Sequence, residues 1–120
     1  MHALIIEDEP LIALFIEEEL RDMGYSCVIV ENEADAVRAA EKQWPDLITV
    51  EERLSQGSGI EAVRRICEQQ PIATVYVLSV PDVHLDRLSP GAVVLGKPFR
   101  STELHHAVAQ AVRSLGSCPE

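Results

Sequence analysis

Short apolar runs alternate along the chain with longer segments in which apolar and polar residues are interleaved. Each run holds three to six mostly apolar residues. This form is typical of a strand that is buried on both faces of a sheet. Five such strands are predicted, at residues 3–6, 27–30, 47–50, 73–78 and 93–95.

The interleaved segments carry their apolar residues at the three- and four-residue spacing of an amphipathic helix. Pro10 begins the first helix and Gly24 ends it, since proline suits the first turn and glycine the position beyond the last. Trp44 closes the second helix and is expected to lie in the core. A third helix begins after Gly59. The last helix has the most regular apolar stripe, with Ser101 as its predicted N-cap.

Strands and helices that alternate in this way predict one α/β domain, a parallel sheet with helices on both faces. A chain of 120 residues suits a single domain. We expect it to cover residues 1–116 and to leave 117–120 as a disordered tail. Residues 80–90 contain two prolines and leave room for only one or two helical turns, so a helix there is expected to be shortened or degenerate.

The chain is acidic, with a net charge of −10. Nucleic acids are therefore not expected as partners, because phosphate contacts need a basic patch. The charge favours cations or basic protein surfaces instead. The apolar runs are too short to span a membrane, no leader segment opens the chain, and the three cysteines are scattered. These features predict a cytoplasmic protein.

Polar residues follow the predicted strands at their carboxyl ends, which is where open parallel sheets bind ligands. They are carboxylates, one hydroxyl and one ammonium: Glu7, Asp8, Glu9, Glu51, Glu52, Ser79 and Lys97. Close carboxylates repel one another and favour a hard cation, a proton or an ammonium group between them. A hydroxyl and a lysine beside them would suit phosphoryl oxygens.

Five motifs in this order resemble the receiver domain of bacterial response regulators. They are Ile-Glu-Asp-Glu-Pro at 6–10, Pro-Asp-Leu-Ile at 45–48, Gly-Ser-Gly-Ile at 57–60, Val-Leu-Ser at 77–79 and Gly-Lys-Pro-Phe at 96–99. The resemblance extends from residue 3 to residue 115. It implies a doubly wound, five-stranded, flavodoxin-like receiver fold and a role in two-component signalling that is not enzymatic.

The resemblance also implies a Mg²⁺ site. Glu7 and Asp8 correspond to the acidic pair, of which Asp8 would bind the metal directly and Glu7 through water. Glu51 and the backbone carbonyl of Arg53 would complete the protein ligands. Three carboxylates, Glu7, Asp8 and Glu51, converge with only Lys97 to balance them, so we expect the cluster to bind Mg²⁺, although weakly.

Glu51 stands where the family has its phosphate-accepting aspartate, which predicts an atypical or pseudo-receiver domain. Ser79 corresponds to the switch hydroxyl of the phosphate pocket, and Lys97 to the lysine that pairs with the phosphoryl group. Pro98 corresponds to a proline with a cis peptide bond.

The chain departs from the family at the acceptor position and nearby. Glu51 is one methylene longer than aspartate, so its carboxylate would project about 1.5 Å further. A misplacement of that size can slow a positioned reaction about a hundredfold. Ser55 stands where the family usually has proline, and Val94 where it has an aromatic residue.

Three interpretations stay open. In the preferred one, the domain is a protein-interaction module of phosphorelay signalling, recognised by a histidine kinase or a downstream effector, and Glu51 imitates a phosphorylated aspartate. In the second, it is a competent receiver that takes phosphate on Glu51 or Glu52. In the third, it is a structural α/β domain that forms a homodimer without a ligand. Asp8 and Ser79 also have simpler alternative roles, as caps of the segments that follow them.

Overall fold

The computed structural model of the protein describes residues 1–79 and 93–116. All nine predicted elements are present in these ranges, and most of their ends lie within one or two residues of the prediction. The strands are β1 (His2–Ile6), β2 (Ser26–Val30), β3 (Leu47–Glu51), β4 (Ala73–Leu78) and β5 (Val93–Gly96). The helices are α1 (Pro10–Asp22), α2 (Glu33–Lys42), α3 (Gly59–Ile66) and α4 (Ser101–Gly116).

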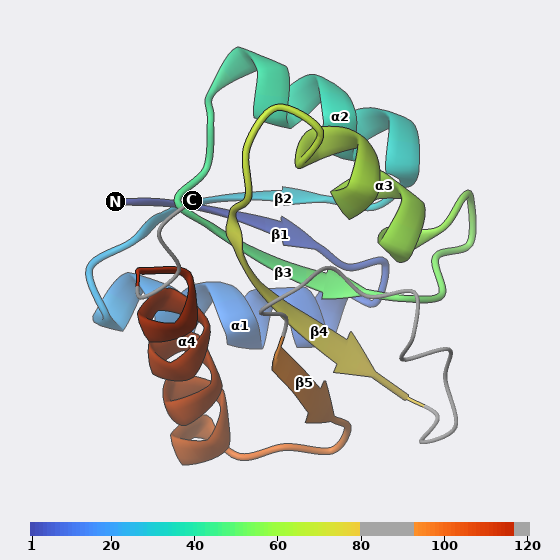
Figure 1. The fold of residues 1–120 in the computed structure, drawn as a ribbon. Coiled ribbons are helices and arrows are strands. Elements are labelled where there is room, and N and C mark those ends of the chain that lie inside the picture. Colours follow the sequence, from blue (N-terminus) through green and yellow to red (C-terminus); the bar gives the residue numbers. More distant parts are fainter. Residues whose placement is uncertain (80–92, 117–120) are drawn as a thin grey trace.

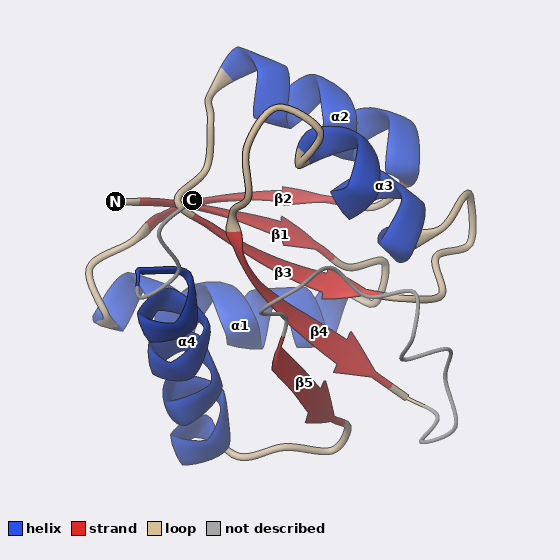
Figure 2. Cartoon of the chain, viewed as in Figure 1, coloured by secondary structure: helices blue, strands red, loops and turns tan. Residues whose placement is uncertain are grey.

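The five strands form one parallel sheet in the order β2-β1-β3-β4-β5. The helices cover both of its faces, with α2 and α3 on one side and α1 and α4 on the other (Figures 1 and 2). The chain therefore winds outwards from the centre of the sheet in both directions. This confirms the predicted doubly wound, flavodoxin-like α/β fold.

Each central strand contributes alternate side chains to two separate cores. In β1, Ile5 packs with residues of α1 and α4, whereas Leu4 packs with residues of α2 and α3. In β4, Val75 and Tyr76 divide in the same way. Because both faces are covered, nearly every strand position must be apolar, which explains the continuous apolar runs in the sequence.

The starts of two helices show one cap that was not predicted, Asn32, and test the cap that was predicted, Ser101. Asn32 caps α2 by accepting a hydrogen bond from the backbone N–H of Asp35 at 2.8 Å. Ser101 is not an N-cap, and that prediction is wrong. It is the first residue of α4, and its hydroxyl donates instead to Oε1 of Glu19 on α1 at 2.6 Å. The Ser101 hydroxyl therefore makes a tertiary contact with α1 and does not cap its own helix.

Gly59 fixes the end of β3 against the start of α3. A Cβ atom at this position would lie 2.0 Å from the backbone oxygen of Glu51, so only glycine allows the two segments to approach so closely. The N–H of Gly59 donates to the carbonyl of Glu52 at 2.9 Å. The backbone around Glu51 is thus held in place by the helix that follows it.

Two predictions fall on other parts of the chain. The shortened helix at residues 80–90 and the tail at 117–120 lie outside the described residues. Among the helices of the described ranges, none has the length and apolar character needed to cross a membrane.

Candidate functional site

The register of the sheet brings three of the predicted site residues together. β1 and β3 pair with Ile6 opposite Val50, so the next residues, Glu7 and Glu51, are neighbours across the two strands. The backbone N–H of Lys97 donates to the carbonyl of Leu78 at 2.8 Å, which places Lys97 at the same edge. The carboxyl ends of β1, β3 and β5 therefore converge, as the fold predicts.

The ammonium of Lys97 lies among three carboxylates. Its Nζ is 2.6 Å from Oε1 of Glu51, 3.2 Å from Oε2 of Glu9 and 3.3 Å from Oε2 of Glu7. Glu7 and Glu51 are almost fully buried, with 2% and 3% of their surface exposed, whereas Glu9 is exposed. We call Glu7, Glu9, Glu51 and Lys97 the acid cluster.

Burial and charge act in opposite directions within the acid cluster. Burial raises the pKa of Glu7 to about 7; Lys97 opposes this rise, and the nearby Glu51 adds to it. Burial lowers the pKa of Lys97, but its contacts with Glu51 and Glu7 outweigh burial and leave that pKa above its usual value. Lys97 thus stays charged at neutral pH, and the pKa of Glu7 lies close to neutral pH.

Some buried polar atoms of the acid cluster and of β3 lack a hydrogen bond. Within the described residues, Oε1 of Glu7 and Oγ1 of Thr49 have no hydrogen-bond partner, and Oε1 of Glu51 has only its ion pair with Lys97. Glu7, Glu9 and Glu51 each offer one carboxylate oxygen, and these oxygens lie within 4.8 Å of one another. Such hard oxygen donors fit a divalent cation such as Mg²⁺.

Asp8 lies beside the acid cluster but bonds elsewhere. Its Oδ2 accepts a hydrogen bond from the backbone N–H of Ser55 at 2.7 Å, and Ser55 lies in the loop between β3 and α3. Glu9, which the sequence interpretation did not assign as a ligand, is the third acid of the cluster. The alternative role of Asp8 as a helix cap is wrong, because Glu9 holds the N-cap position of α1 and makes no side-chain cap. The predicted metal-binding role of Asp8 stays a prediction.

The other predicted site residues are placed as follows. Ser79 directly follows β4 and is exposed, and between the described residues no hydrogen bond joins it to Glu51 or Lys97. The backbone N–H of Arg53 donates to Oε2 of Glu51 at 3.4 Å, so Arg53 borders the acid cluster, although its carbonyl remains only a predicted ligand. The Lys97–Pro98 peptide bond is cis, as predicted.

The fold and this site define a class of signalling domain, and comparison with known sequences agrees. The sequence model of the response regulator receiver domain matches residues 3–109, and the chain belongs to this family. The predicted family is thus confirmed. Receiver domains are signalling modules and not enzymes, which also agrees with the prediction.

Particular relatives include regulators from several bacteria. The phyllosphere-induced regulator PhyR of Methylorubrum extorquens is 31% identical over 114 residues, which cover 91% of this chain and 42% of PhyR. The transcriptional regulatory protein PdtaR of Mycobacterium tuberculosis is 34% identical over 113 residues, with coverage of 91% and 55%. The chain therefore spans about half the length of these relatives.

Solved structures show the same architecture. The receiver domain of PhyR from Erythrobacter litoralis matches with a TM-score of 0.88 and 28% identity, over 99% of this chain and 95% of that domain. PhyR from Brucella abortus matches with a TM-score of 0.84 and 30% identity, over 93% of this chain and 47% of that chain. These likenesses support the receiver fold that the described residues show.

Proposed function

We propose that this receiver domain is an atypical one in which Glu51 supplies a permanent negative charge in place of a phosphorylated aspartate. In this role the domain acts as a protein-interaction module of two-component signalling. The observation that carries the proposal is the 2.6 Å contact between Oε1 of Glu51 and Nζ of Lys97. The family resemblance assigns Lys97 to the phosphoryl group, and here the glutamate carboxylate reaches that lysine by itself.

The geometry of Glu51 also argues against its use as a phosphate acceptor. An acceptor carboxylate must present a free oxygen in line with the phosphodonor, within a few tenths of an ångström. One oxygen of Glu51 is paired with Lys97, and the other accepts the weak hydrogen bond from the N–H of Arg53. The side chain is almost completely buried. Attack on a donor would require both contacts to break.

Mg²⁺ is proposed as a weak ligand of the acid cluster. Three carboxylates against one ammonium leave an excess of negative charge, which a divalent cation would neutralise. Glu7, Glu9 and Glu51 are the candidate ligands that the structure groups together. Asp8 and the carbonyl of Arg53 are the further ligands that the family resemblance implies.

The proposed partner is a protein, either a histidine kinase or a downstream effector. PhyR from Bartonella quintana, which shares 30% identity with this chain, is described as an anti-anti-sigma factor. We infer that a regulatory protein is a more suitable partner here than a nucleic acid, because the net charge of −10 opposes phosphate contacts.

The test combines a small phosphodonor with two substitutions of Glu51. Wild-type protein incubated with acetyl phosphate and Mg²⁺ is expected to keep its mass, whereas Glu51→Asp, which restores the shorter acid, is expected to gain one phosphoryl group of about 80 Da. Glu51→Gln removes the charge at nearly constant size. It is expected to shift the backbone amide resonances around Lys97 and to weaken binding to a partner.

The alternatives predict different results in the same experiment. A gain of about 80 Da by the wild type would make the domain a competent receiver. Loss of that gain in Glu52→Gln, but not in Glu51→Gln, would identify Glu52 as the acceptor. If Glu51→Gln changes neither the amide resonances nor partner binding, the mimicry proposal is wrong, and a concentration-dependent dimer would then favour the structural interpretation.

A further inference from the structure

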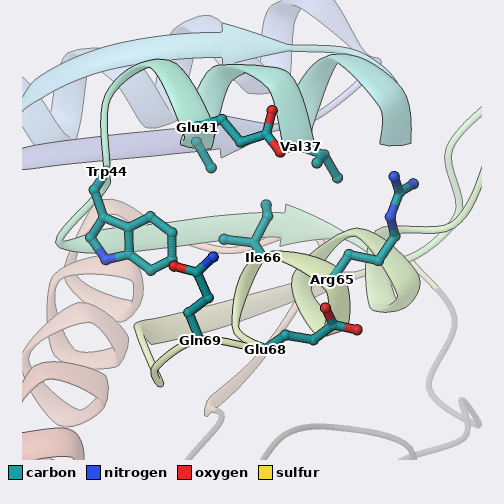
Figure 3. Close-up of a pocket in the computed structure, with 8 residues that line it drawn as sticks. Val37, Glu41, Trp44, Arg65, Ile66, Glu68 and Gln69 are labelled. Atoms are coloured by element: carbon teal, nitrogen blue, oxygen red, sulfur yellow. The ribbon is translucent and has the colours of Figure 1, made fainter.

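A groove lies between the carboxyl-terminal ends of α2 and α3, on the face of the sheet opposite α1 and α4. Figure 3 shows its lining, and its volume is about 260 Å³. Its apolar surface comes from Val37, Ala40 and Ile66, with Trp44 beside them. No residue of the acid cluster lines it. Trp44 precedes β3 whereas Glu51 ends it, so the groove belongs to the opposite edge of the sheet.

Trp44 is a large aromatic side chain that lies partly exposed at the surface. It was expected in the core, but 37% of its surface is accessible, because α2 ends at Lys42 and Trp44 stands beyond the buried stripe of the helix. Pro45, the next residue, is buried and ties the chain back to the sheet. The indole is thus held at the surface by a fixed backbone, with its ring along the groove (Figure 3).

The charged residues of the groove give it a negative rim. Glu41 and Glu68 are both exposed, and within the described residues neither has a cation within ion-pair distance. Arg65 does not neutralise them, because its Nη1 is bonded to Oε2 of Glu33 at 3.1 Å. In Figure 3 the Arg65 guanidinium points away from Glu68 and Trp44.

We propose that this groove binds a basic side chain, an arginine or a lysine, of a protein partner. The cation would lie over the indole face of Trp44, an arrangement that the ring's electron distribution favours. Glu41 and Glu68 would supply the opposite charges, and the aliphatic stem would cover Val37 and Ile66. A volume of about 260 Å³ accommodates one such side chain and not a folded segment. This contact is separate from the proposed role of Glu51.

The test uses Trp44 as its own reporter, since it is the single tryptophan of the chain. The probe is the peptide acetyl-Arg-Gly-Gly-Arg-amide, titrated into the uniformly labelled protein at low salt. We expect the indole N–H of Trp44 and the amides of residues 65–69 to shift together, with one dissociation constant in the millimolar range. Matched peptides with glutamate or serine in place of arginine should leave these resonances unchanged.

Nonspecific attraction must be separated from the groove, because the whole chain is acidic. The double variant Glu41→Gln, Glu68→Gln is expected to weaken peptide binding about fivefold, and Trp44→Leu by a similar factor. The control is Glu18→Gln, Asp22→Asn on α1, which removes the same charge from two exposed acids and should leave the affinity within a factor of two of the wild type.

Three results would overturn the proposal. The first is a Trp44 indole resonance that does not move while other amides do. The second is an equal loss of affinity in the groove variant and in the α1 control. The third is equal binding of the serine or glutamate peptide. Because Trp44→Leu can disturb folding, the two glutamine substitutions at exposed positions keep the test decisive.

Discussion

Glu7 and Glu33 each contact a basic side chain, but their carboxylates are satisfied to different degrees. Glu33 accepts from the N–H of Ser58 through one oxygen and from Arg65 through the other, both at 3.1 Å. Glu7 shares the ammonium of Lys97 with two other acids, and its second oxygen has no hydrogen-bond partner within the described residues. Hydrogen bonding and Arg65 lower the pKa of Glu33, whereas burial raises that of Glu7.

The contrast separates a structural contact, that of Glu33, from a candidate functional site, the acid cluster. The contacts of Glu33 join the start of α2 to α3 and give each of its carboxylate oxygens a donor, so they stabilise the fold. The acid cluster places three carboxylates around one lysine and buries two of them, Glu7 and Glu51, which a stabilising network would avoid. Arrangements that shift a pKa through burial and like charges are typical of functional sites.

The largest expected effect comes from removing the lysine. Lys97→Met would leave Glu7 and Glu51 buried without a cation, and we expect the free energy of unfolding at pH 7.5 to fall by about 3 kcal/mol. Urea unfolding measures this loss. The comparison is Arg65→Met, which breaks an exposed pair and should cost less than about 1 kcal/mol.

Two further results decide what the Lys97 experiment means. Glu51→Gln added to Lys97→Met should restore part of the stability, because it removes one of the unpaired charges. If Lys97→Met and Arg65→Met cost the same, the acid cluster is no different from a surface ion pair, and the contrast with Glu33 fails.

The fold and the convergence of the site were predictable because both follow from periodicity and topology. Strands buried on both faces leave continuous apolar runs, and parallel strands must present their carboxyl ends at one edge. Residue type and position in the predicted strands therefore indicate Glu7, Glu51 and Lys97 as neighbours at this edge. No long-range information was needed for these three residues.

What the sequence could not reveal depends on contacts between distant residues. Glu9 and not Asp8 belongs to the acid cluster, because the Asp8 carboxylate is bonded to the backbone N–H of Ser55, 47 residues further along the chain. Ser101 makes a bond to Glu19, on another helix, in place of a cap. Trp44 is exposed because α2 ends two residues earlier than its apolar pattern. None of these contacts can be predicted from residue type and spacing.

The pH dependence of stability is the second way to test the contrast between Glu7 and Glu33. The pKa of Glu7 is raised to about 7 in the folded protein, so its contribution is fully present below 4.5 and is lost as the pH rises through 7. The free energy of unfolding of the wild-type protein should fall by about 2 kcal/mol between pH 5 and pH 8. That of the Glu7→Gln variant should not show this fall.

Glu33 provides the control of opposite sign. Its pKa is lowered on folding, so its contribution is present above pH 4.5 and is lost as the pH falls below that value. Glu33→Gln should therefore follow the wild type between pH 5 and pH 8 and differ from it only in acid. A wild-type stability that stays level between pH 5 and pH 8 would contradict the assignment of Glu7.

The smallest expected effect concerns the hydrogen bond that separates Asp8 from the acid cluster. Ser55 stands where receiver domains usually have proline, and a proline has no N–H to donate. Ser55→Pro would remove the 2.7 Å bond to Asp8 and release a fourth carboxylate beside Glu7, Glu9 and Glu51. We expect Mg²⁺ to bind about fivefold more tightly, since ligand charge governs affinity for hard cations. Amide shifts of residues 7–9 and 51–53 in a Mg²⁺ titration measure this change.

Ser55→Ala keeps the N–H and should bind Mg²⁺ like the wild type, and Asp8→Asn should cancel the gain in the proline variant. A proline variant that retains the wild-type affinity would show that Asp8 has no part in metal binding, and the cluster of three glutamates would then be the whole site.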